Sequence, residues 1–480
     1  MNRKTVLIVS SALALVVIAM VLELRGRAGR ATAKPVSTTP ALACGGPAAP
    51  AEAAQSFGAG VVRATLSGER VLQGSDGQMY LAVELSTGPA ATGRRGPLTL
   101  AIVIDRSGSM ASEEKLARAK DAALGLVERL GDEDQVALVQ YDHTAEVVVP
   151  LTALNQTGKA RLREAVSGLV ARGSTNLYQG LQLGRDEVLR GLRQGGVNRV
   201  ILLTDGLVNT GVTDSTTIAQ MAGAAADQQG VRVTTVGLGY QYNEDLLEAI
   251  AENGRGSYYY VKDAPALQEV FAGELRAIQG TVGTHAELRL EPRCAGVAVE
   301  DVYGYRVRRE GGAVIVPLAD LAGGDRRKLV ARLRVPVGVA GRVNLVAATL
   351  SFDDARQGGR RTAALTVGVE VSPDAQAVAR AVNKPMVAQA LEVEGARAMR
   401  RAADAYKRGD VAAANQANRD WSAEAQKQAK KFALPAPAVQ RMNQALDSQN
   451  ADFGRYAPGS AAGQHAVKRQ KASSIDMFKK

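Results

Sequence analysis

The alternation of apolar and helical segments between residues 97 and 280 is the feature that most restricts the fold of this chain. Short apolar runs, among them Leu98–Ile104 and Arg199–Thr204, alternate with segments of helical spacing such as Leu116–Leu130 and Leu177–Leu192. A continuous apolar run is typical of a strand buried on both faces. Strands separated by helices pair in parallel through right-handed crossovers. The pattern therefore predicts a doubly wound, mainly parallel α/β sheet, with a binding crevice beyond the carboxyl ends of its strands.

Polar side chains gather in three loops at this predicted edge. Asp105, Ser107 and Ser109 directly follow the first of the two strands, and Asp205 directly follows the second. Thr175 lies in a loop between them in sequence, just before a helix. Two carboxylates and three hydroxyls, without thiolate or imidazole, suit Mg²⁺ or Mn²⁺, which prefer octahedral oxygen ligands. So few carboxylates would leave the ion partly electropositive, and a partner's Asp or Glu could complete its shell.

Each part of this pattern also has a simpler interpretation. Asp and Ser residues commonly build turns and helix caps, and a Thr-Asp-Gly sequence is usually a turn. Ser174 and Thr175 would also suit the start of the following helix. The oxygens could further form a hydrogen-bond network without any metal. Their joint order, each at a strand end or in a neighbouring loop, favours the metal site.

The Asp-x-Ser-x-Ser motif, the threonine and the Thr-Asp-Gly motif together resemble the metal-ion-dependent adhesion site of von Willebrand factor A (VWA) domains, in particular the membrane-anchored or secreted bacterial type. The resemblance implies a Rossmann-like VWA domain at residues 97–280 and metal-dependent protein binding rather than catalysis. It also implies a ligand set. Ser107, Ser109 and Thr175 would ligate Mg²⁺ or Mn²⁺ through their hydroxyls, and Asp105 and Asp205 would do so directly or through water.

Motifs of common enzymes are incomplete in this sequence. No Gly-x-Ser-x-Gly surrounds the serines, and Gly158-Lys159 lacks the earlier glycine of a phosphate-binding loop. Gly237-Leu-Gly239 is followed by Tyr242 where a dinucleotide-binding motif needs a third glycine. His143 falls in a predicted hairpin turn and is interpreted as an ordinary surface histidine. We therefore expect no enzymatic activity, with a metal-assisted hydrolase as the alternative.

Charge and cysteine content exclude other classes. The net charge of +11 is spread along the chain without a nucleic-acid-binding motif, so no nucleic acid is expected as a partner. Two cysteines, Cys44 and Cys294, are too few for a disulfide scaffold, a cysteine-rich zinc module or an iron–sulfur protein.

The N-terminus carries the strongest localisation signal. Thr5–Leu22 is almost wholly apolar and as a helix would extend about 27 Å, enough to cross a hydrocarbon core. An uncleaved membrane anchor is the preferred interpretation, because a small-residue cleavage site follows only late. We expect most of the chain to lie outside the cytoplasm, in the periplasm or at the cell surface; secretion after signal cleavage is the alternative.

Outside the α/β segment, alternating runs predict flanking β-sandwich elements, and the Ala-, Gln- and Lys-rich C-terminal part predicts helices. A structural subunit that assembles through this helical tail is a further hypothesis. The predicted parts are a membrane anchor or signal segment (1–29), a flexible linker (30–57), strands that pack with the sandwich (58–96), the VWA domain (97–280), a β-sandwich-like domain (281–372), a helical hairpin or bundle (373–455) and a basic, disordered tail (456–480).

Overall fold

The computed structural model describes residues 47–89, 97–193, 196–239, 241–262, 266–355, 357–435 and 437–479. The predicted anchor or signal segment (1–29) and most of the predicted linker lie outside these residues. Within the described ranges, no helix combines the length and the apolar character that a membrane span requires.

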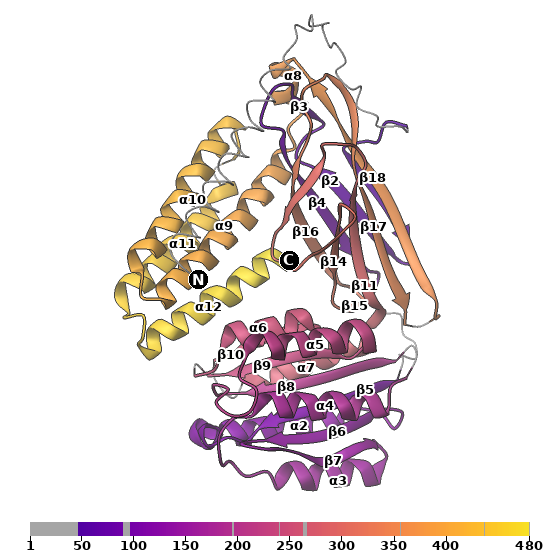
Figure 1. Cartoon of the computed structure of the whole chain (residues 1–480), viewed down its shortest axis with the longest axis vertical. Helices are drawn as coiled ribbons and strands as arrows, with labels where there is room; N and C mark the ends of the chain where they lie inside the picture. The colour runs from indigo at the N-terminus through magenta and orange to yellow at the C-terminus, as the bar shows by residue number, and fades with distance from the viewer. Residues whose placement is uncertain are drawn as a thin grey trace, which may run out of the picture. The chain divides into compact units, whose positions relative to one another are not determined.

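Among the described residues, six strands form a sheet in the order β10-β9-β8-β5-β6-β7 (Figure 1). The strands are β5 (Leu98–Asp105), β6 (Gln135–Tyr141), β7 (Ala145–Ala153), β8 (Val197–Thr204), β9 (Arg232–Leu238) and β10 (Arg255–Val261). The pairs are parallel except β6 with β7, which are antiparallel because a tight turn joins them. The predicted doubly wound, mainly parallel sheet is confirmed.

Helices cover both faces of this sheet, and a separate apolar core lies under each layer. On one face Leu100 and Ile102 of β5 pack with α2 (Lys115–Glu128), α3 (Gln156–Ser167) and α7 (Leu267–Gln279). On the other face Ala101 and Val103 pack with α4 (Leu177–Arg190), α5 (Ser215–Gln229) and α6 (Glu244–Asn253). Successive side chains of a strand point to opposite faces, so a strand buried on both sides is apolar at every position.

Strands before and after the α/β domain combine into two further sheets. One has the order β1-β2-β4-β16-β12, and the other has the order β13-β14-β11-β17-β18-β3, with β15 paired to β11. The strands are β1 (Glu52–Phe57), β2 (Gly60–Leu66), β3 (Arg70–Leu72), β4 (Gln78–Ser86), β11 (Thr281–Pro292), β12 (Ala298–Val302), β13 (Arg308–Glu310), β14 (Ala313–Pro317), β15 (Leu321–Ala322), β16 (Arg326–Arg334), β17 (Gly341–Asp354) and β18 (Arg360–Ser372).

The prediction of a linker through residue 57 is wrong at its end, because Glu52–Phe57 forms β1 and pairs with β2. The side chains of β1 are mostly exposed or half-buried, so the segment lacks the apolar pattern that identifies a strand in sequence.

Beyond the sheets, the described chain continues as helices. These are α8 (Ala375–Arg380), α9 (Lys384–Lys407), α10 (Val411–Lys431), α11 (Pro437–Arg455) and α12 (Ala461–Lys479). Met386 of α9 and Trp421 of α10 share an apolar core with Ala82 of β4 and Val330 of β16. The helices thus pack on the face of the sheet that contains β4 and β16.

The prediction of a disordered basic tail at 456–480 is wrong, because α12 is a packed helix. Its Lys468 Nζ lies 2.7 Å from Glu244 Oε2, and its Lys471 Nζ lies 2.6 Å from Asp245 Oδ1 of α6. Both lysines are buried. Their partners lie 224 and 226 residues away in sequence, so the local pattern shows only unpaired positive charge.

The ion pairs at Asp245 predict a pH-dependent contribution to stability. Burial would raise the pKa of Asp245, but hydrogen bonds from Lys407 and Lys471 lower it from 3.8 to about 2. Since the folded-state pKa lies below the unfolded one, the contribution is full above about pH 4 and is lost as the pH falls through about 2. Because Asp245 is half-exposed, we expect Asp245→Asn to lower the Tm by only about 2 °C near neutral pH. Thermal unfolding followed by circular dichroism should show this difference vanish in acid; a constant difference would contradict it.

Candidate functional site

The predicted site residues meet at the carboxyl edge of the central sheet. β5 and β8 are parallel neighbours, and Ile104 lies opposite Leu203 in their register. The next residues of both strands therefore reach the same edge. The loop between α3 and α4 is held against this edge by a hydrogen bond of 3.0 Å from the Gly108 amide to the Gly173 carbonyl.

Both predicted carboxylates are fully buried at this edge. Asp105 Oδ2 accepts a hydrogen bond of 2.6 Å from Thr204 Oγ1, and Asp105 Oδ1 accepts one of 2.7 Å from the Ser107 amide. Burial raises the pKa of Asp105 to about 7, against the effect of these hydrogen bonds, and the negative Asp205 nearby adds to the rise. A positive charge beside Asp105 would favour its ionised form.

The three predicted hydroxyls lie together next to Asp205. Ser107 Oγ and Ser109 Oγ are 3.1 Å apart, and Ser109 Oγ donates a hydrogen bond of 2.7 Å to Asp205 Oδ1. A Cβ atom added to Gly206 would lie 3.1 Å from Thr175 Oγ1, 3.5 Å from Ser109 Oγ and 3.7 Å from Ser107 Oγ. Hydroxyls from two loops therefore surround one point beside Gly206, which belongs to a third loop.

This donor set fits a hard divalent cation. It consists of oxygen atoms, which Mg²⁺ and Mn²⁺ prefer, and it includes two carboxylates as counter-charges. The described residues contain no group of three or more His, Cys, Asp or Glu side chains that could hold a metal. The side chains that converge here are instead the two carboxylates and three hydroxyls that the sequence predicts. That these side chains bind a metal remains a prediction.

Asn176 resolves one of the alternatives left open by the sequence. Its side chain, not that of Ser174 or Thr175, caps α4 by accepting a hydrogen bond from the Gln179 amide. The Thr175 backbone is fixed separately, because its amide donates to Asn209 Oδ1 at 2.8 Å. The Thr175 hydroxyl is therefore not needed to start the helix and faces the other hydroxyls.

Lys115 is a site residue that sequence reasoning missed. It is the first residue of α2, it is buried, and its Nζ lies 3.0 Å from Asp205 Oδ2. Its ammonium group supplies a counter-charge to Asp205 and would repel a cation bound beside the same carboxylate. A lysine near two acidic residues could be noticed in the sequence, but its direction toward Asp205 depends on the packing of α2.

We expect Lys115→Met to strengthen Mg²⁺ binding. Methionine keeps most of the buried volume while the repelling charge disappears, so the affinity should rise about tenfold. Isothermal titration of Mg²⁺ into the wild type and the variant measures this change. Lys120→Met, on the exposed side of the same helix, is the control and should leave the affinity unchanged. Equal affinities for wild type and Lys115→Met would contradict this role.

Asp142, also missed in the sequence, connects the loops that carry the site. It follows β6 and is fully buried, with Arg106 Nη2 at 2.8 Å and Arg172 Nε at 3.3 Å. Burial would raise its pKa, but hydrogen bonds and the nearby positive charges lower it below the ordinary value. A Cβ on Gly173, whose φ is +75°, would lie 3.2 Å from Asp142 Cβ, so glycine permits this close approach.

The site opens into a cavity of about 1120 Å³. Its lining residues include Ser107, Ser109 and Thr175 on one side, and Gln464 and Lys468 of α12 on the other. The predicted crevice beyond the strand ends is therefore present, and the C-terminal helix forms part of its wall.

Residues considered for other chemistry take structural positions. His143 is 58% exposed at its side chain, lies beside Asp142 in the turn after β6, and is not among the residues lining the cavity. The Tyr242 hydroxyl forms a hydrogen bond with Tyr258 at 2.9 Å, and burial raises the pKa of both phenols. Tyr259 donates a hydrogen bond to Glu274 of α7.

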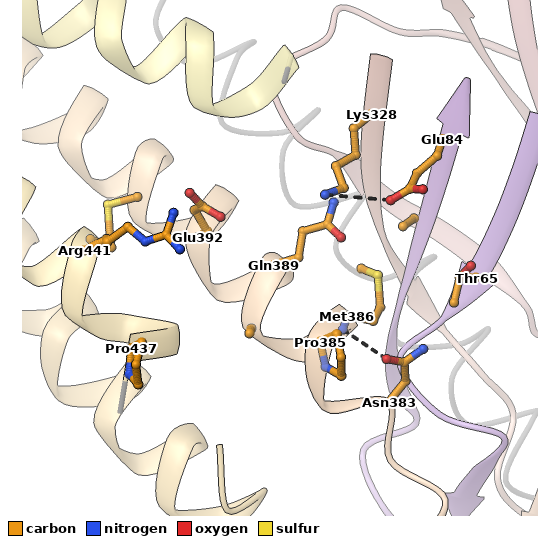
Figure 2. Close-up of a pocket in the computed structure, with 13 residues that line it drawn as sticks. Thr65, Glu84, Lys328, Asn383, Pro385, Met386, Gln389, Glu392, Pro437 and Arg441 are labelled. Carbon is orange, nitrogen blue, oxygen red and sulfur yellow. Dashed lines mark hydrogen bonds and ion pairs between the residues drawn. The ribbon is translucent and has the colours of Figure 1, made fainter. Parts of the chain in front are cut away.

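Another hollow in the described part of the chain, of about 400 Å³, lies between the helices and the β-sheet (Figure 2). Figure 2 shows Glu84 and Lys328 on the strands, and Gln389, Glu392 and Arg441 on the helices. Lys328 Nζ and Glu84 Oε1 are 3.7 Å apart and compensate each other's charge. None of its described lining residues belongs to the predicted metal site.

Comparison with known protein families identifies the α/β segment. Residues 99–273 match the family model of the von Willebrand factor type A domain. These residues have the fold of a VWA domain. The matched region begins at the second residue of β5, ends within α7 and includes all five predicted site residues.

Two bacterial proteins are similar in sequence. The uncharacterized protein YfbK of Escherichia coli is 33% identical over 211 residues, which are 44% of this chain and 36% of that protein. The uncharacterized protein sll0103 of Synechocystis is 30% identical over 274 residues, which are 55% of this chain and 64% of that protein. The matches thus span less than two thirds of either relative.

The structure is also similar to a solved VWA protein over most of its length. The von Willebrand factor type A structure from Catenulispora acidiphila aligns with a TM-score of 0.66 over 89% of this chain and 97% of that chain, at 18% identity. The shared fold therefore extends beyond the VWA domain into the β and helical regions.

Proposed function

We propose that the VWA domain binds Mg²⁺ or Mn²⁺ through Asp105, Ser107, Ser109, Thr175 and Asp205, and thereby captures an Asp or Glu carboxylate of a partner protein. VWA domains typically mediate protein–protein interaction. The proposal that a metal ion and a partner's carboxylate take part in it rests on the convergence of two buried carboxylates and three hydroxyls at one end of the cavity.

The residues of this chain have separate roles in the proposal. Asp105 and Asp205 balance the charge of the cation, and Thr204 together with the Ser107 amide fixes the orientation of Asp105. The hydroxyls complete the oxygen shell without adding negative charge. The bound cation would supply the positive charge that attracts a partner's carboxylate. The cavity gives that carboxylate access to the site.

We further propose a binding role without catalysis. The carboxylates that line the cavity, Glu244 and Asp245, are paired with Lys407 and other lysines. Such pairing disfavours proton uptake, so neither carboxylate suits a general base.

We propose that the chain is tethered to a membrane and acts outside the cytoplasm, in adhesion or envelope assembly. The apolar segment 5–22 supports the tether. Cys294 is disulfide-bonded, which supports an oxidising compartment, since disulfides persist there and are rare in the cytosol. Protease treatment of cells with a permeabilised outer layer and of lysed spheroplasts tests the location; protection in the permeabilised cells together with digestion in the lysed spheroplasts would contradict it.

Metal-dependent capture of envelope proteins tests the function. We expect the wild type with Mg²⁺ to retain a partner that is lost on adding a chelator and lost in Thr175→Ala. Thr152→Ala is the matched control, because the Thr152 hydroxyl donates a hydrogen bond of 2.6 Å to the Pro150 carbonyl and the residue does not line the cavity. Capture that ignores both the chelator and Thr175→Ala would overturn the proposal.

A further inference from the structure

The cavity at the candidate metal site has two walls that come from distant parts of the chain. Ser109, Thr175 and Leu207 belong to the loops of the VWA domain, whereas Ala461 and Gln464 belong to α12. The candidate site therefore lies in a groove and not on an open surface, so α12 restricts the direction from which a partner can approach.

Ion pairs and ring contacts hold α12 in place as the second wall. Lys468 Nζ lies 3.8 Å from the centre of the Tyr242 ring and donates a hydrogen bond of 2.9 Å to the Tyr242 carbonyl. His465 Nδ1 is hydrogen-bonded to the Tyr260 hydroxyl at 2.5 Å. Ala461 and Gln464 remain exposed on the groove side of this fixed helix.

The groove has little net charge of its own apart from the candidate metal site. The charged lining residues Glu244 and Asp245 are paired with Lys407, and Glu244 also with Lys468. The remaining lining is mostly small or uncharged and includes Ser174, Asn209, Ser215, Gln241 and Gln464. Leu207, just after Gly206, is 58% exposed and offers an apolar contact beside the site.

We propose that this groove receives an extended segment of a partner protein that carries a single Asp or Glu between uncharged residues, one of them apolar and packed on Leu207. The inference rests on the proposed function and specifies its partner. The volume of about 1120 Å³ slightly exceeds that of sites for drug-sized ligands, about 300–1000 Å³, and suits a few residues of extended chain. The flat face of a folded domain would collide with α12, whereas a segment lies between the walls.

A peptide selection tests the proposal on the full chain. Phage-displayed linear peptides with a fixed central aspartate and random flanks are selected with Mg²⁺ or with chelator, beside a library with central asparagine. Ala461→Trp is designed to fill the groove, and Ala462→Trp is the matched control, because Ala462 is also exposed but does not line the groove. Calorimetric titration of Mg²⁺ into the wild type and the two variants accompanies the selection.

We expect Mg²⁺-dependent enrichment of aspartate peptides with uncharged, partly apolar flanks. Recovery should fall about tenfold in Ala461→Trp and stay unchanged in Ala462→Trp, while Mg²⁺ affinity stays equal in all three. Mg²⁺ binding without this enrichment, or equal recovery by Ala461→Trp, overturns the groove proposal and leaves the proposed function standing. Absence of Mg²⁺ binding to the wild type overturns both.

Discussion

Asp105→Asn is expected to weaken Mg²⁺ binding by about 100-fold, or about 2.7 kcal/mol, without destabilising the metal-free protein. Asparagine matches aspartate in shape but removes one of the two negative charges that would balance the cation. In the absence of metal, the buried carboxylate of Asp105 has its pKa raised to about 7, so replacing it with a neutral group costs the fold little. Calorimetric titration and the Tm without metal measure the two effects separately.

The control for this variant is Asp132→Asn, which makes the same change at an exposed turn outside the site. It should leave Mg²⁺ affinity unchanged. An Asp105→Asn protein that binds Mg²⁺ as tightly as the wild type would show that Asp105 is not a ligand or counter-charge. A large fall in its Tm would show that the carboxylate has a structural role instead.

Asp320→Ala is expected to destabilise the protein by about 3–5 kcal/mol. Asp320 lies in the loop before β15 and forms ion pairs with Arg199 of β8, at 3.0 Å, and with Arg232 of β9. Arg199 also pairs with Glu274 of α7. All four side chains are buried, so removing Asp320 leaves two guanidinium groups with less counter-charge away from water. Denaturant unfolding of both proteins measures the loss.

Asp301→Ala serves as the comparison, because Asp301 forms a more exposed ion pair with Arg397. Exposed pairs contribute about 0–1 kcal/mol, so this variant should unfold almost as the wild type does. Equal effects of Asp320→Ala and Asp301→Ala would show that the buried ion pairs of Asp320 stabilise the protein no more than an exposed pair does.

The sequence predicts the central sheet and the convergence of the candidate site because both depend on local patterns. β5 is continuously apolar over Leu100–Ile104 and β8 over Val200–Leu203, and parallel strands that are neighbours end at the same edge. The positions of Asp105 and Asp205 follow from these two facts alone.

Features that depend on contacts between distant residues could not be predicted in the same way. Tertiary packing directs Lys115 toward Asp205. The packing of α12 as an ordered helix depends on carboxylates of α6 that neutralise its lysines. In the sequence, Lys468 and Lys471 indicate only a basic, soluble tail. The groove wall at Gln464 was missed for the same reason.

A crystal grown with Mn²⁺, measured at the manganese absorption edge, tests the central claim most directly. We expect one anomalous difference peak within bonding distance of the Ser107, Ser109 and Thr175 hydroxyls, next to Gly206. The absence of an anomalous peak at this position at a saturating Mn²⁺ concentration would contradict the account. A peak that lies away from these three side chains would contradict it as well.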